Sequence, residues 1–197
     1  MKKMELSIRL GLASVIMWLS SSCTSLSKHT PPFRPPPVET RQLSNGLTMM
    51  VLKDSSLPRF QLNLIMKMGS RLDPKGQEGL NHLFFSLLDQ GTKTRSAEKI
   101  AQELNQLGTE ISQGAGTDTS FVSVAGLKVF QDSILEIFSD VIFHPSFEPA
   151  EVDRVRRLNI SSLQKILDSP PSYASAKMDE LLYQNHPYAR SSVGSSE

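Results

Sequence analysis

Residues 69–86 read GSRLDPKGQEGLNHLFFS and join a strand to a helix. Before them, apolar residues alternate with polar ones over residues 60–68, broken only at Ile65, which predicts a strand with one buried face. The second half of the stretch is too rich in Leu and Phe for a surface helix. We therefore expect a buried helix at residues 79–89, ended by a glycine cap at Gly91.

The segments around this turn alternate between strand and helix signals. Asn45-Gly46 is the strongest signal for a two-residue hairpin turn, and Ser96 can cap a helix that Gly108 stops. Strand pairs interleaved with helices, without a regular strand–helix–strand repeat, predict an α+β fold with a largely antiparallel sheet flanked by helices. We expect strands at residues 39–44, 47–53, 60–68, 109–113 and 118–125, and helices at residues 79–89, 97–107, 129–143, 149–167 and 170–183.

The N-terminus has the composition of an export signal. Three cationic side chains accompany an apolar run at residues 10–19, which is too short to span a bilayer. Small residues follow, so we interpret residues 1–22 as a bacterial-type signal peptide. Cys23 would then be the mature N-terminus and the site of lipidation, although Ser20 stands where the usual lipoprotein motif has Leu. Cleavage without lipidation is the alternative.

Residues 23–38 are rich in Ser and Thr and then in Pro, a composition that favours extended polyproline II and buries nothing. We expect a lipid-anchored tether that joins the membrane to a domain beginning at residue 39. The expected location is the bacterial cell envelope, where the chain would be an exported, membrane-anchored lipoprotein facing the periplasm. A ligand for a proline-recognition module is the alternative, but such modules are mainly cytosolic.

Charge and cysteine content exclude other classes. The 197 residues include 21 Lys or Arg and 20 Asp or Glu, which gives a net charge of +1. Nucleic-acid-binding domains normally carry a strongly basic surface, so we expect no nucleic-acid partner. A single cysteine cannot form an intramolecular disulfide or a cysteine-rich metal site.

From Gln42 to Glu197 the chain resembles the insulinase/pitrilysin family of inverzincin metallopeptidases, which includes the subunits of mitochondrial processing peptidase. The resemblance is carried, in family order, by LSNGLTMMVL, GSRLDPKGQEGLNHLFF, DQGTKTRS, ELNQLGTEISQGAGTDTSFVSV, IFHPSFEP and NHPYARSSVGS. It implies a metallopeptidase- or processing-peptidase-like N-terminal domain over residues 39–197. Family members continue with a further helix, a strand and a second domain, so we expect this domain to be truncated before it is complete.

The zinc motif of that family is degenerate here. In H-x-x-E-H, two histidines four residues apart on a helix bind zinc, and the glutamate deprotonates the metal-bound water. The resemblance aligns this motif with residues 82–86, HLFFS. His82 keeps the first ligand, Phe85 occupies the position of the base, and Ser86 occupies that of the second histidine. The third ligand, a glutamate on a later helix, falls at Ser161 or Ser162.

One imidazole cannot hold zinc, and a phenyl ring cannot accept a proton. We therefore expect no catalytic residue, no cofactor or metal and no peptidase activity, with zinc confined to active family members. His82 is expected to remain as a helix histidine hydrogen-bonded to Ser86. The other histidines are expected in the tether, at a helix end and in a turn, at His29, His144 and His186.

Three functions stay open at this point. The first is a non-catalytic, lipid-anchored subunit that pairs with a catalytic insulinase/pitrilysin-type homologue and helps to bind peptide. The second is an active zinc metalloendopeptidase that uses other ligands. The third is a truncated envelope lipoprotein with no peptidase role. Bound metal in the purified protein would favour the second function.

Overall fold

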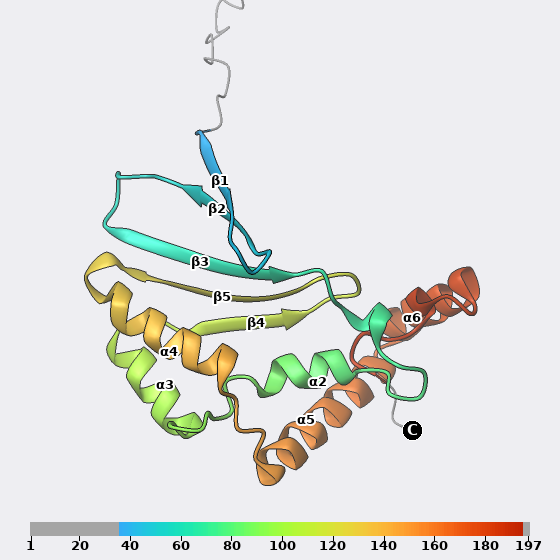
Figure 1. Ribbon diagram of the computed structural model, residues 1–197. Coiled ribbons are helices and arrows are strands. Elements are labelled where there is room, and N and C mark those ends of the chain that lie inside the picture. Colours follow the sequence, from blue (N-terminus) through green and yellow to red (C-terminus); the bar gives the residue numbers. More distant parts are fainter. Residues whose placement is uncertain (1–35, 195–197) are drawn as a thin grey trace, which may run out of the picture. The chain divides into compact units, whose positions relative to one another are not determined.

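The computed structural model describes residues 36–194 (Figure 1). The chain forms two compact units, which divide between Asp54 and Ser55. The predicted signal peptide, Cys23 and nearly all of the predicted tether lie outside the described residues. None of the described helices combines the length and the apolar character that a membrane span requires.

The first unit contains an antiparallel hairpin of β1 (Val38–Gln42) and β2 (Thr48–Leu52). The main-chain N–H of Leu43 donates to the carbonyl oxygen of Leu47 at 2.8 Å, and Gly46 has a φ of +86°. The hairpin is as expected, but its loop is longer than a two-residue turn. A hairpin loop of this length needs a residue with a left-handed backbone conformation near its end. Gly46, two residues before β2, adopts this conformation without steric cost.

The second unit is built on a three-stranded antiparallel sheet in the order β3-β5-β4. Leu62 of β3 lies opposite Val124 of β5, and Gln113 of β4 lies opposite Val122. Val122 and Val124 are buried, whereas Phe121, one residue before Val122, is exposed on the other face. The α+β class and the antiparallel pairing are therefore confirmed. The strands are β3 (Arg59–Met66), β4 (Ile111–Ala115) and β5 (Ser120–Leu127).

Helices α2, α3 and α4 lie on one side of this sheet in Figure 1. Phe85, Ile100 and Ile134 are at most 2% exposed and fill the space between the helices and the sheet. The helices are α2 (Leu80–Leu87), α3 (Ala97–Gln106), α4 (Gln131–Phe143), α5 (Pro149–Leu167) and α6 (Pro170–Tyr183), with short 3₁₀ turns η2 (Ser70–Leu72), η3 (Lys128–Phe130) and η4 (Pro187–Ala189).

Several element boundaries differ from expectation by one or more residues, and two of them have an identifiable cause. Helix α2 ends at Leu87, and Gly91 is not its cap, because the carbonyl of Gly91 accepts the N–H of Ser146 in a loop contact at 3.0 Å. The turn between β4 and β5 lies two residues later than predicted, where Gly116 donates to the Thr119 carbonyl at 2.9 Å. The Gly91 contact joins distant residues, and the carbonyl of Gly116 also accepts the N–H of the distant Ser70 at 3.0 Å.

Candidate functional site

Asp73 holds the start of α2. One carboxylate oxygen accepts the main-chain N–H of Gly79 at 2.8 Å, and the other accepts that of Asn81 at 3.0 Å. The first N–H groups of a helix have no partner within the helix, and a negative charge there is favourable. Because Asp73 is buried, its carboxylate takes the place that water would have at an exposed helix start.

Two glycines of the same stretch permit close backbone contacts. A Cβ atom at Gly69 would collide with the carbonyl of Thr117 in the turn between β4 and β5. A Cβ atom at Gly79, which has a φ of +92°, would collide with the carbonyl of Val193. The segment before α2 is thereby pressed between two other loops, and neither position accepts a larger residue.

Ionic contacts link those loops to the same segment. Arg71 Nε lies 3.0 Å from Asp118 Oδ1, and the Tyr188 hydroxyl donates to both oxygens of Asp118 at 2.9 Å. The hydrogen bond to Asp118 raises the pKa of Tyr188. Arg190 Nη1 lies 3.6 Å from Glu78 Oε1. These contacts join residues that are far apart in the sequence around the start of α2. We call the group the α2 clamp, and its members are Arg71, Glu78, Asp118, Tyr188 and Arg190.

His82 lies on α2 and is half-buried, and this burial lowers the pKa of its imidazole. Among residues 36–194 the imidazole has no hydrogen-bond partner. The Ser86 hydroxyl donates to the main-chain carbonyl of His82 at 2.8 Å, not to the ring as expected. A serine inside a helix readily reaches the carbonyl one turn earlier, which explains the difference.

Phe85, at the position of the family's base, is 1% exposed and belongs to the core. Its ring meets that of Phe84 edge to face, with centroids 5.2 Å apart and planes at 83°. Phe85 therefore differs from the family's glutamate in two ways: it lacks a carboxylate, and its ring has a structural role. It fills the space between α2 and the sheet, where an ionised group would carry a large desolvation cost.

Helix α5 packs against α2 and carries both candidate positions for the third ligand. Ser161 and Ser162 are exposed, whereas Val155 and Leu163 are buried. At 3.6 residues per turn, Ser162 lies about 20° from Val155 around the helix, and Ser161 lies about 120° away. Of the two serines, Ser162 lies closer around α5 to the buried Val155, although its own side chain is exposed.

The remaining histidines have local roles. His144 Nδ1 lies 3.3 Å from Asp140 Oδ1, one turn earlier in the chain. His186 Nδ1 accepts the N–H of Tyr188 at 3.2 Å and begins η4. Within residues 36–194 there is no group of three or more His, Cys, Asp or Glu side chains placed to hold a metal ion.

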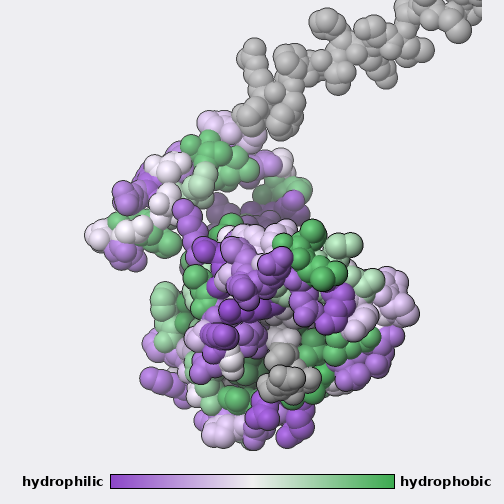
Figure 2. All heavy atoms as spheres, turned by 90° about the vertical axis from the view of Figure 1, so that its right-hand side faces the viewer, coloured by the Kyte–Doolittle hydropathy of each residue, from purple (hydrophilic) through white to green (hydrophobic). Residues whose placement is uncertain are grey.

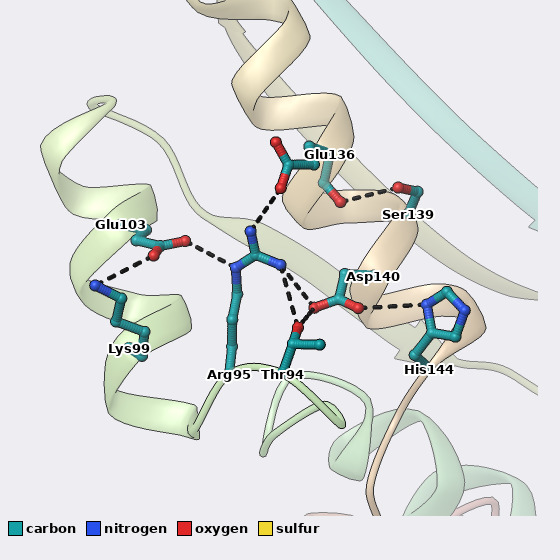
Figure 3. A pocket seen from close by; sticks show the side chains of 8 residues that line it. All are labelled: Thr94, Arg95, Lys99, Glu103, Glu136, Ser139, Asp140 and His144. Atoms are coloured by element: carbon teal, nitrogen blue, oxygen red, sulfur yellow. Dashed lines mark hydrogen bonds and ion pairs between the residues drawn. The ribbon is translucent and has the colours of Figure 1, made fainter.

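An open hollow between α3 and α4 contains a charge network that sequence patterns did not reveal (Figure 3). Arg95 donates to Glu103 at 2.9 Å and to Glu136 and Asp140 at 2.8 Å. Hydrogen bonds to these carboxylates raise the pKa of Arg95. The ion pairs join the two helices, and the three carboxylates exceed the two cations, Arg95 and Lys99, by one negative charge.

Asp140 is the most enclosed acid of this network. Burial acts to raise its pKa, but hydrogen bonds from Thr92, Thr94 and Arg95 outweigh burial and lower the pKa to about 2. The two threonine hydroxyls donate to Asp140 Oδ2 at 2.7 and 2.8 Å. The carboxylate is therefore ionised throughout the neutral range. The sequence offered no periodic signal for it, because Arg95 and Asp140 are 45 residues apart.

Comparisons with known proteins agree with this geometry. The family model of insulinase (peptidase family M16) matches residues 49–196. An uncharacterized zinc protease of Rickettsia felis is 26% identical over 156 residues, which cover 79% of this chain and 38% of that protein. The non-peptidase homolog YmxG of Helicobacter pylori is 25% identical over 160 residues, which cover 80% of this chain and 37% of that protein.

A solved structure is also similar. The crystal structure of the peptidase M16 inactive domain from Pseudomonas fluorescens superposes with a TM-score of 0.77 at 27% identity. The match covers 81% of this chain and 39% of that one. The chain thus spans less than two fifths of the length of the relatives it matches.

Replacing Asp73 tests whether it holds α2. Asp73→Ala should lower the free energy of unfolding by about 2 kcal/mol or more, because a cap is lost and two buried N–H groups lose their acceptor. Urea denaturation measures the change. Asp153→Ala, which removes an exposed carboxylate on α5, should change it by less than about 0.5 kcal/mol. Equal losses in the two variants would contradict the assigned role.

The low pKa of Asp140 predicts a pH dependence. The pKa is about 2 in the folded protein against 3.8 ordinarily, so the stabilisation is complete above about pH 4 and is lost as the pH falls toward 2. Asp140→Asn should destabilise the protein by about 3 kcal/mol at pH 7 and reduce the loss between pH 4 and 2. Unfolding free energies over this range, with exposed Asp132→Asn as control, measure both effects. An unchanged pH slope in Asp140→Asn would refute the assignment.

Proposed function

Since the chain belongs to the insulinase family, peptidase family M16, we propose that it is a non-catalytic member, which pairs with a catalytic homologue and helps to bind peptide. The observation that carries this proposal is the position of Phe85. The family's mechanism needs a proton acceptor there, and this chain has a core phenyl ring that is 1% exposed.

The donor atoms do not fit zinc. Zinc sites in proteins use three or four side-chain donors, mostly imidazole, thiolate or carboxylate. The aligned positions provide one imidazole, the Ser86 hydroxyl that is bonded to the main chain, and an exposed hydroxyl at Ser161 or Ser162. No catalytic step through a metal can be derived from these groups.

The scaffold, in contrast, is preserved. The hydrogen bonds of Asp73, the close contact at Gly79 and the α2 clamp with Asp118 fix the position of α2, which carries the degenerate zinc motif. A domain that keeps the fold of the family but lacks its catalytic residues suits a role in pairing and in holding peptide. The names of the Helicobacter pylori homolog and the Pseudomonas fluorescens inactive domain support the non-catalytic part of this proposal. The name of the Rickettsia felis zinc protease favours the alternative, an active metalloendopeptidase with other ligands.

Metal content separates these two functions. The protein expressed from Thr24 onward without a metal-binding tag should contain far less than one equivalent of zinc after dialysis, because only one of the family's ligands is present. Elemental analysis gives the stoichiometry. About one zinc per chain, lost in His82→Ala, would favour the active peptidase and refute our proposal.

Restoring ligands tests the alignment itself. Ser86→His with Ser162→Glu should create a site that binds zinc together with His82. Phe85 is left in place because the core depends on it. The control, Ser86→His with Ser161→Glu, should bind zinc less tightly, since Ser161 lies on another side of α5. If neither folded variant gains zinc, the two helices do not present these positions to one metal ion.

We further propose that the chain is exported and lipid-anchored in a bacterial envelope. The cationic residues, the ten-residue apolar run and Cys23 before a proline-rich segment support this. Stable anchoring needs more than one acyl chain, which a modified N-terminal cysteine can carry on its thiol and amino groups. A lipoprotein without a peptidase role remains the alternative function for such an anchor.

Cys23→Ser tests the anchor. The wild-type protein should incorporate labelled fatty acid and fractionate with membranes, whereas Cys23→Ser should move to the soluble periplasmic fraction, because the lipid attaches to the cysteine thiol. Ser25→Ala, which leaves that thiol intact, should behave as the wild type. Absence of label from the wild type, or a membrane-bound serine variant, would refute lipidation.

A further inference from the structure

Residues 186–194 follow α6 in the chain and return to the start of α2, and we call this segment the strap. Its Tyr188 hydroxyl donates to both carboxylate oxygens of Asp118 at 2.9 Å. Arg190 Nη1 lies 3.6 Å from Glu78 Oε1, just before α2. Both contacts belong to the α2 clamp, and both side chains of the strap lie in or directly after the short turn η4. The position of η4 therefore sets whether the strap reaches α2.

The turn η4 begins with a histidine cap. His186 Nδ1 accepts the main-chain N–H of Tyr188 at 3.2 Å. The common caps, such as Ser and Asn, keep their acceptor oxygen at every pH. A histidine differs, because it changes charge between about pH 5 and 8 and both its ring nitrogens are donors when it is protonated. The strap is therefore capped only while the imidazole of His186 is neutral.

Solvent reaches this imidazole, because His186 is exposed. It follows α6 in the chain, and Figure 2 views the side of the molecule on which α6 lies, where hydrophilic and hydrophobic residues meet at the surface. Within residues 36–194 no carboxylate forms an ion pair with His186, whereas His144 is paired with Asp140. A proton on His186 therefore gains no ionic partner that offsets the loss of the cap.

The titratable groups near the ring belong to α6, η2 and the strap itself. The ring centroids of Tyr188 and Tyr183 lie 4.6 and 6.3 Å from that of His186. Asp179 lies one turn before Tyr183 on the same side of α6. Among the described residues none of these groups accepts the Tyr188 N–H, so a charged imidazole leaves it without its acceptor. The other charged groups of these elements form ion pairs, which are Lys177 with Glu180, Arg71 with Asp118, and Arg190 with Glu78.

We propose that the strap is a pH-sensitive switch at the start of α2. With neutral His186, the cap fixes η4 and keeps Tyr188 bonded to Asp118. As the pH falls, the imidazole gains a proton, Nδ1 ceases to accept the Tyr188 N–H, and the strap loosens from α2. This contribution to stability is therefore present at about pH 8 and is lost toward about pH 5. The inference goes beyond the proposed function, because it involves neither a zinc ligand nor a partner.

Hydrogen exchange at two pH values tests the switch. Protection factors are corrected for the intrinsic pH dependence of exchange. For the Tyr188 amide they should be about fivefold lower at about pH 5 than at about pH 8, since one hydrogen bond is worth about that much. Amides of residues 79–82 should lose protection as well, because the strap contacts the start of α2. A loss confined to Tyr188 would mean a cap without a switch and would overturn the proposal.

The matched variant is His186→Asn, which keeps a capping acceptor but removes the titrating ring. Its protection factors should agree with those of the wild type at the higher pH and change by less than about twofold at the lower pH. His186→Ser introduces a second cap of this kind and should behave in the same way. His144→Asn and His82→Asn remove the other histidines of residues 36–194 and should keep the wild-type pH dependence.

Three results would contradict the switch. The first is equal protection of the wild type at the two pH values. The second is the same loss of protection in both His186→Asn and His186→Ser as in the wild type. The third is loss of the pH dependence in His144→Asn or His82→Asn, since the switch would then lie at that histidine.

Discussion

The carboxylate of Asp73 beneath the first turn of α2 is the contact on which the second unit depends. It satisfies two main-chain N–H groups, those of Gly79 and Asn81, that would otherwise be buried without a partner. With the start of α2 fixed, the helix runs along the sheet so that Phe85 enters the core. The contacts of Arg71 and Arg190 close the surrounding loops on the same point.

In this arrangement, the residues that stabilise the fold differ from those at the positions of the family's catalytic groups. The residues through which the chain resembles its family, such as Gly69, Asp73 and Gly79, are held by packing and hydrogen bonds that require no metal. The positions that would carry the reaction have instead become part of the structure. Phe85 adds apolar contacts to the core, and Ser86 returns a hydrogen bond to its own helix. A fold of this kind keeps a recognisable sequence after its catalytic groups are gone.

Charged and apolar groups are distributed differently over the second unit. The hollow around Arg95 brings one cation to three carboxylates, and these ion pairs join α3 to α4. Helix α6 presents the opposite case, since Lys177 is paired with Glu180 within the helix and its leucines are exposed.

The sequence by itself determined the α+β class, the antiparallel strands, the Ser96 cap and the start of α6 at Pro170, because periodicity, capping and proline act locally. It also determined that Phe85 and Ser86 cannot serve as base and ligand, since side-chain chemistry is independent of packing. Only the tertiary structure showed that Val155 is buried on α5, which brings Ser162 nearer to the packed side than Ser161, and joined Arg95 to Asp140. Such contacts join residues distant in the chain, and no local pattern records which of them packing will bring together.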